Sequence, residues 1–306
     1  MSSSVREEFV LDLLRENGPL TGKELQESLN INDLDLWRFC RRHPLIEVTI
    51  VGRRYLRLDD NVAGYGRLSP SIKREFLIYT VASLAEHSRQ CRERAQEIEQ
   101  GFAEISRQKI DLARERMAAI AASLSFEDRV NKEVCFVIAG DVVYGMAHRE
   151  PRPEFSTGRM VNGSDLDVVI VTTDEFPADL TRQLDDAVYR EKYRLLILPN
   201  YREEIDYIIK NMSRVQKQLA FNNFKHMVAC KILHEGKYLY GSRRMFEILK
   251  EMVWQAGMDE KLGLLERKAD AYRRSAEEEL LSSTEDLSEQ ESWKLFYTEA
   301  EHNEIF

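Results

Sequence analysis

Apolar and β-branched residues concentrate in three runs in the middle of the chain, and polar turns separate them. The run 134–139 ends at a Gly-Asp pair, and the run 166–172 follows the polar sequence Gly-Ser-Asp. Apolar runs of this length, bounded by turn residues, indicate strands. With the helical periodicity between them, they predict a small mixed sheet with helices on one side. In chain order, we expect strand 134–139, helix 142–148, an irregular loop, strand 166–172, helix 178–194, a short strand over 195–198 and strand 203–209.

The first 60 residues combine helical and β periodicity. Thr21, followed by Glu24 three residues later, predicts a capping box at the start of the second helix. Two short β-rich runs follow the third helix, and the Val-Gly-Arg between them predicts a hairpin. The expected elements are helices 5–17, 21–29 and 34–42, then strands 46–50 and 54–58.

Three helices followed by a hairpin resemble the winged helix-turn-helix, a DNA-binding fold. Arginines on the third helix and on the predicted wing are candidate phosphate contacts. Asp33 and Asp35, however, stand at the start of the third helix, where acids repel a DNA duplex. Both DNA and a docked protein therefore stay open as partners of this module. The candidate DNA-binding residues are Arg38, Arg41, Arg42, Arg53, Arg54 and Arg57.

A linker at 60–70 precedes a stretch, 72–124, that contains no proline and has mostly helical periodicity. Small or apolar residues recur there at alternating steps of three and four, which is a heptad-like pattern. We expect a long helical spacer whose seam supports a homodimer. An antiparallel hairpin folded at Gly101, or a helix packed against its own chain, fits the same spacing. The seam consists of Val81, Leu84, Ser88, Cys91, Ala95, Ile98, Phe102 and Ile105.

The candidate chemistry lies in Asp165, Asp167 and Asp206. Strand alternation places Asp165 and Asp167 on one side and turns Leu166 to the other. Two carboxylates on one face repel each other, and a divalent cation offsets that repulsion. Hard oxygen ligands suit Mg²⁺ or Mn²⁺. Asp206, an isolated acid in the later β-rich run, is the third candidate ligand.

An apolar strand, a glycine turn, Asp-x-Asp in a second strand and a third strand acid resemble the polymerase β-like nucleotidyltransferase superfamily. The resemblance covers residues 130–245, including the segment 231–241 after the third strand. It implies transfer of a nucleoside monophosphate from an NTP, with Mg²⁺ or Mn²⁺ held by Asp165, Asp167 and Asp206. It also implies that Asp206 holds the acceptor-side ion. The nucleotide contacts that it implies are Gly140, Asp141, Gly145, Ser164 and Lys231.

Asp141 departs from the family pattern, which has a serine at this position. The serine hydroxyl donates to the triphosphate, whereas an ionised carboxylate cannot donate and would repel it. Three outcomes follow: Asp141 joins the metal shell, a lysine screens it, or the enzyme is weakened.

Helices are expected after the sheet region, over 213–233, 243–255 and 259–281, and the last two resemble the domain that closes over the nucleotide in this superfamily. The tail from Glu277 is strongly acidic, which excludes nucleic acid from that surface. The expected fold class is therefore α+β. Its parts are a winged helix-turn-helix (1–62), a long helical spacer (70–126), a nucleotidyltransferase domain with a mixed sheet (130–212) and a C-terminal helical domain (213–306).

Composition narrows the function classes. The 306 residues carry a net charge of −9, which argues against diffuse binding to nucleic acid. Four scattered cysteines form no CxxC pair and six histidines show no HExxH spacing, so neither a zinc ribbon nor a disulfide framework is indicated. No apolar leader or membrane-spanning run is apparent, so we expect a cytoplasmic protein with no membrane partner.

The sequence therefore predicts a pyrophosphate-releasing enzyme that uses an NTP such as ATP. Its acceptor is the hydroxyl of an RNA 3′ end, a protein or a small molecule, and a toxin-like or defence-type enzyme is one version of this hypothesis. The alternative is a nucleotide-sensing winged-helix DNA-binding regulator with an inactive nucleotidyltransferase-like domain. Retention of all three carboxylates favours the enzyme.

Overall fold

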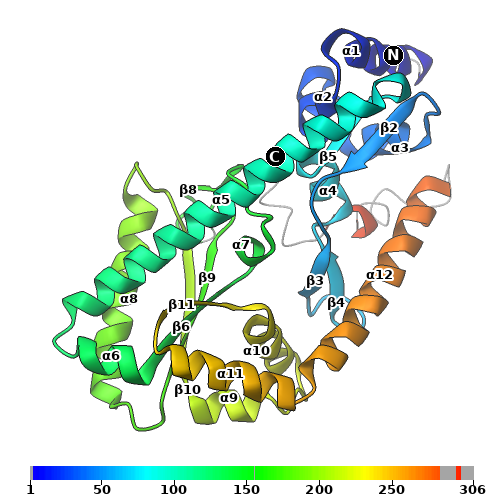
Figure 1. The fold of residues 1–306 in the computed structure, drawn as a ribbon. Coiled ribbons are helices and arrows are strands. Elements are labelled where there is room, and N and C mark those ends of the chain that lie inside the picture. The colour runs from blue at the N-terminus through cyan, green and yellow to red at the C-terminus, as the bar shows by residue number, and fades with distance from the viewer. Residues whose placement is uncertain (1–2, 155, 283–293, 298–306) are drawn as a thin grey trace. The chain divides into compact units, whose positions relative to one another are not determined.

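The computed structural model describes residues 3–154, 156–282 and 294–297 (Figure 1). The chain forms two compact units: an amino-terminal unit of Met1–Gly101 with Leu265–Phe306, and a sheet unit of Phe102–Leu264. The boundaries between them fall inside two long helices, α5 (Ser88–Ser123) and α12 (Met258–Ser282). None of the described helices is long and apolar enough to cross a membrane.

The amino-terminal unit packs its helices around a three-stranded sheet ordered β1-β5-β2. The predicted capping box is confirmed, because Thr21 Oγ1 accepts from Glu24 N at 3.1 Å and the Glu24 carboxylate accepts from Thr21 N at 2.7 Å. Leu14 and Leu25 are fully buried in the core that these helices share. The elements are α1 (Ser3–Asn17), β1 (Leu20–Thr21), α2 (Gly22–Leu29), α3 (Asp33–Arg42), β2 (Ile46–Ile50), β3 (Tyr55–Leu58), β4 (Gly66–Ser69), α4 (Ile72–Ile78), β5 (Thr80–Leu84) and the 3₁₀ turn Ala85–His87.

The predicted hairpin between 46–50 and 54–58 is wrong, although both strands exist. Strand β2 pairs with β5, and β3 pairs with β4 in a separate two-stranded sheet. The predicted linker over 60–70 is therefore partly a strand. Strand β5 lies between β1 and β2, beside β2 where β3 was expected, and all five of its residues are buried.

The predicted continuous helix over 72–124 is also wrong, because β5 interrupts it. Val81 and Leu84, spaced three apart as on a helix face, are both buried strand residues. Further along the expected seam, Cys91 and Ala95 on α5 are buried, and Cys91 Sγ lies 3.4 Å from Thr49 Oγ1. Much of the seam therefore packs within its own chain, one of the alternatives that the spacing left open.

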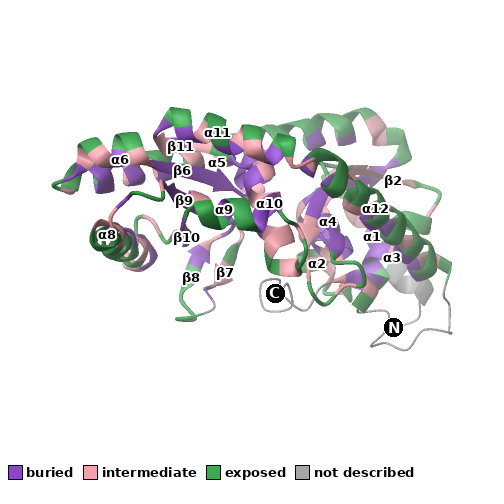
Figure 2. Cartoon of the chain, turned by 90° about the horizontal axis from the view of Figure 1, so that it is seen from below, coloured by how far each residue is buried: buried purple, intermediate pink, exposed green. Residues whose placement is uncertain are grey.

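The sheet unit contains a four-stranded sheet ordered β10-β9-β6-β11, in which β9 and β10 are parallel and the other neighbours are antiparallel. Leu166 and Ile170 of β9 face a core shared with α5, α6 and α8. Helix α9 lies on the opposite face, where Lys210 of β10 donates to Gln218 of α9. Helices therefore cover both faces, and the predicted one-sided arrangement is wrong (Figures 1 and 2).

Several elements of the sheet unit match the expected bounds to the residue, including strands 134–139 and 166–172 and helix 243–255. Others differ: helix 142–148 is a single turn, 195–198 lies mostly in α8, 213–233 is two helices, and β7, β8 and β11 were not predicted. The elements are α6 (Glu127–Glu133), β6 (Val134–Ala139), α7 (Asp141–Tyr144), β7 (Pro151–Pro153), β8 (Met160–Asn162), β9 (Leu166–Thr172), α8 (Ala178–Ile197), β10 (Ile205–Asn211), α9 (Met212–Gln218), α10 (Phe224–Glu235), β11 (Lys237–Gly241) and α11 (Arg243–Gln255).

Candidate active site

The three candidate aspartates lie at the amino-terminal ends of two neighbouring strands, β9 and β10. Strands β9 and β10 run parallel with Asp206 directly beside Asp167, and neighbouring strands are about 4.8 Å apart. Leu166 and Ile205 are fully buried on the core face, so alternation turns Asp165 and Asp167 to the other face, as predicted. Carboxylates that are more than 30 residues apart in the chain are thereby brought together by strand pairing.

Gly140 ends strand β6 beside the Asp167 carboxylate. Ala139 is paired with Asp167, and a Cβ built on Gly140 would lie 2.3 Å from Asp167 Oδ2. Gly140 also has φ +77°, in the left-handed region that favours glycine. Any side chain at this position would displace the carboxylate, so the glycine makes room for Asp167.

Cations hold two of the aspartates in place. Lys192 Nζ lies 2.9 Å from Asp206 Oδ1, and an Arg152 guanidinium nitrogen lies 3.9 Å from Asp165 Oδ2. Arg152 also pairs with Glu204 at 2.8 Å. Burial, with the negative charges of Asp206 and Asp165 nearby, raises the pKa of Glu204 despite Arg152. Arg152 and Lys192 thus offset the negative charge of Asp165, Glu204 and Asp206.

Within the described ranges, no three His, Cys, Asp or Glu side chains are placed so that they could hold a metal ion as they stand. The oxygen donors are nevertheless of the type that Mg²⁺ and Mn²⁺ prefer. To act as ligands together, Asp165 and Asp206 must turn from Arg152 and Lys192 toward Asp167.

Lys109 of α5 supports the turn that carries Ser164 and Asp165, and it was not predicted as a site residue. Its ammonium donates to the carbonyl oxygens of Asn162 and Ser164, each at 2.8 Å, and pairs with Glu203. Burial lowers the pKa of Lys109 and raises that of Glu203. The one sequence feature that could have found this lysine is its place on the same helix face as Ile105 and Ala113.

Asp141 and Ser164 contact each other directly. Ser164 Oγ donates to Asp141 Oδ2 at 3.1 Å and accepts from His148 N at 3.2 Å. Gly145 ends α7 with φ +74° and a backbone hydrogen bond to Asp141 O. The structure therefore brings Asp141 and Ser164 together beside the first of the three aspartates.

Glu235, at the end of α10, is a site residue that sequence reasoning missed. Its carboxylate accepts from Gly140 N at 3.2 Å and from the Tyr144 hydroxyl, and it pairs with Lys231. Lys231, the predicted triphosphate contact, thus reaches the glycine turn through Glu235. The only pointer in the sequence is the position of Glu235 directly before Gly236, inside the family-like segment.

The predicted DNA-binding arginines belong to the amino-terminal unit, where three of them contact α12. Arg38 Nε donates to Leu280 O at 2.9 Å, and Arg42 donates to Leu281 O. Arg54 pairs with Glu75 and, at 2.8 Å, with Glu277. The other three arginines of the predicted set are Arg41, Arg53 and Arg57.

Comparison of the chain with protein-family models, with curated proteins and with solved structures found no match. The chemistry must therefore be argued from the residues of the site. Its most specific feature is the placement of three carboxylates beside a glycine turn, where strands β9 and β10 begin and strand β6 ends.

Proposed function

We propose that the sheet unit is a divalent-metal-dependent nucleotidyltransferase that transfers a nucleoside monophosphate from an NTP to an acceptor hydroxyl. One observation carries the proposal: Asp206 pairs in register with Asp167, and Asp165 lies two residues earlier on the same side. Gly140 supports the proposal as well, because a side chain there would displace the Asp167 carboxylate from its place beside Asp206.

Each aspartate has a distinct place in this proposal. Asp165 and Asp167 would hold a divalent cation together, and such a cation neutralises phosphate charge and activates a hydroxyl when bound. Asp206 is the more open neighbour, with 54% of its side chain exposed against 36% for Asp165. It is therefore the better placed to meet an acceptor hydroxyl and to take its proton at Oδ1 once Lys192 moves away.

Asp141 fits this site as an additional carboxylate. Its hydrogen bond from Ser164 keeps it next to the turn that precedes Asp165. Lys231, the predicted triphosphate contact, is paired with Glu235. A place in or beside the metal shell is therefore the role we propose for Asp141.

The amino-terminal unit supports a winged-helix assignment with an insertion. Helix α1, strand β1, helices α2 and α3, and strands β2 and β5 follow the order of that fold, with 51–79 inserted before the last strand. The surface of α3 is occupied, however: Trp37 packs on Phe296 with ring centroids 5.8 Å apart. Arg38 and Arg42 bind the end of α12. We therefore propose that this surface docks the C-terminal part of its own chain and does not contact DNA, and salt-dependent binding of the full chain to DNA would contradict that choice.

A labelling assay tests the enzymatic proposal. The full chain is incubated with each α-labelled NTP and Mg²⁺ or Mn²⁺, and total cellular RNA and protein serve as acceptors. We expect pyrophosphate release and one labelled class of acceptor, with both lost in Asp167→Asn and kept in the matched control Asp186→Asn, an exposed aspartate on α8. Nucleotide binding without transfer would instead support the regulator hypothesis.

A further inference from the structure

Strand β10 leaves one side of its backbone open. Among the described residues, β10 pairs with β9 alone. Leu166 N donates to Glu204 O at 2.9 Å, so the backbone groups of Glu204 face β9. Because these groups alternate along a strand, those of Asp206, Ile208 and Lys210 also face β9. The N–H and C=O groups of Tyr207 and Ile209 therefore point away from the sheet.

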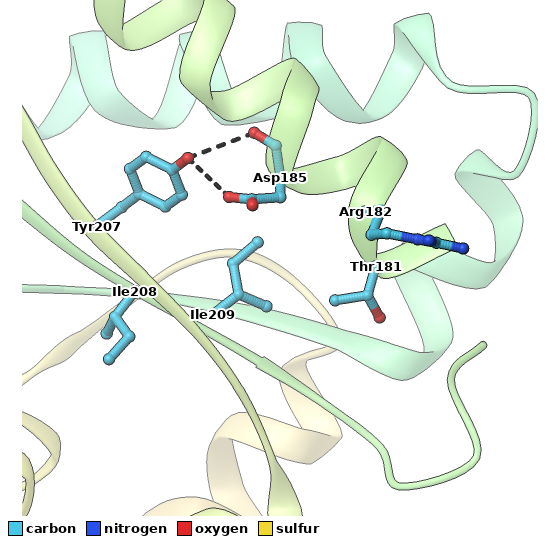
Figure 3. Close-up of a pocket in the computed structure, with 6 residues that line it drawn as sticks. All are labelled: Thr181, Arg182, Asp185, Tyr207, Ile208 and Ile209. Atoms are coloured by element: carbon cyan, nitrogen blue, oxygen red, sulfur yellow. Dashed lines mark hydrogen bonds between the residues drawn. The ribbon is translucent and has the colours of Figure 1, made fainter. Parts of the chain in front are cut away.

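The open edge borders a hollow of about 480 Å³ between β10 and α8. Tyr207 and Ile209 project toward α8, where Tyr207 Oη donates to Asp185 Oδ1 at 2.7 Å, and Ile208 projects to the other side (Figure 3). Ile208 is 39% exposed. Exposed sheet edges are usually protected by proline, bulges or inward-pointing charges, and the centre of β10, Tyr207-Ile208-Ile209, has none of these.

Lys210, at the end of the same strand, is buried without a carboxylate partner in the described part of the chain. Only 5% of the residue is exposed, and its ammonium donates to the Gln218 amide oxygen at 3.0 Å. Burial, helped by the nearby Arg214, lowers the pKa of Lys210 to about 8. A buried cation beside a second cation calls for an anion from elsewhere.

We propose that a second copy of this chain covers the edge, so that two β10 strands pair antiparallel about a two-fold axis at Ile208. In this register Tyr207 of one copy and Ile209 of the partner subunit exchange backbone hydrogen bonds, because both have outward-facing groups. Asp206 then lies opposite Lys210 of the partner subunit, on the same face. The strand is thus self-complementary in charge, as a two-fold interface requires.

This dimer differs from the one that the sequence suggested. The heptad-like seam is largely packed within its own chain, whereas the β10 edge offers unused backbone donors and acceptors together with an exposed isoleucine. The interface also adjoins Asp206, so dimerisation places a lysine of the partner subunit beside the proposed acceptor side of the active site. The pairing itself is argued from the strand alone and does not depend on the enzymatic proposal.

Disulfide trapping tests the register. At the two-fold axis, Ile208 faces its own copy in a non-hydrogen-bonded pair, with Cα atoms about 4.5 Å apart. That separation lies within the range that a disulfide bridges. The four native cysteines are buried, which favours the new thiol as the site of reaction. We expect Ile208→Cys to form a covalent dimer under mild oxidation, and Ile248→Cys, at an equally exposed isoleucine on α11, to stay monomeric.

Solution mass provides the second measurement. By light scattering, we expect the wild-type chain to show twice the 35.7 kDa mass of one copy. Ile208→Asp should halve that mass, because it places two like charges face to face, and Ile248→Asp should leave it unchanged. A monomeric wild-type chain, a dimer that survives Ile208→Asp, or equal cross-linking of the two cysteine variants would overturn the proposal.

Discussion

Lys210 allows a test in which the pH dependence of folding reports on a single buried group. Its pKa falls from 10.5 to about 8 in the folded chain, mainly through burial. A shift of this size corresponds to about 3 kcal/mol. Below pH 8 the lysine is charged in both the folded and the unfolded state, so the folded state carries the whole cost of burying the charge. Between pH 8 and 10.5 the folded lysine loses its proton first, and the free energy of unfolding rises with pH.

We therefore predict that Lys210→Met changes the free energy of unfolding differently at pH 7 and at pH 10.5. The free energy of unfolding of the variant, minus that of wild type, should be about 3 kcal/mol higher at pH 7 than at pH 10.5. The variant lacks the hydrogen bond to Gln218 at both pH values, so this loss cancels when the two differences are compared. Urea denaturation followed by circular dichroism measures the difference.

Two controls sharpen this test. The exposed Lys217 lies on α9, and Lys217→Met should show no such pH dependence. Both chains are compared at protein concentrations low enough for light scattering to show a monomer, so no partner carboxylate can neutralise Lys210. The reasoning is refuted if wild type and Lys210→Met differ by the same amount at both pH values under those conditions.

Three other predictions address the site and its support. Asp141→Ser should lower turnover in the labelling assay if Asp141 adjoins the metal shell, and a gain in turnover would contradict that role. Lys109→Met should lower the free energy of unfolding, measured by urea denaturation, by about 3–5 kcal/mol, because it leaves Glu203 buried and unpaired. Adding Glu203→Gln should restore part of that loss. No recovery in the double variant would contradict the role of the pair. Phe296→Ala should cost about 3–5 kcal/mol by calorimetry, because Phe296 is fully buried against Trp37; an unchanged unfolding transition would contradict that docking.

The sequence predicted best the features that depend on neighbouring residues. The capping box at Thr21 and the strands at 134–139 and 166–172 follow from local spacing, and the structure has them where expected. Strand β5 was missed because Val81 and Leu84 fit a helical period and every residue of the strand is buried. A strand that is buried on both faces has no alternation to distinguish it from a helix.

The candidate site shows the same division. Asp165 and Asp167 could be found because alternation is a local property, and Asp206 because it interrupts an apolar run. Lys109 and Glu235 could not be found in this way, because each reaches the site from a helix that is distant in the chain. Arg38, Arg42 and Arg54 were expected to face DNA, and only the folded chain shows that α12 lies against them.

The central claim is that Asp165 and Asp167 hold a divalent cation beside Asp206, and Mn²⁺ binding tests it most directly. Electron paramagnetic resonance measures free Mn²⁺ during titration of the full chain, with and without a non-hydrolysable NTP analogue. We predict saturable binding by the wild-type chain that is strengthened by the analogue, lost in Asp165→Asn/Asp167→Asn, and retained in Asp186→Asn. Equal Mn²⁺ binding by the wild-type chain and the double variant, or no binding by either, would contradict the claim.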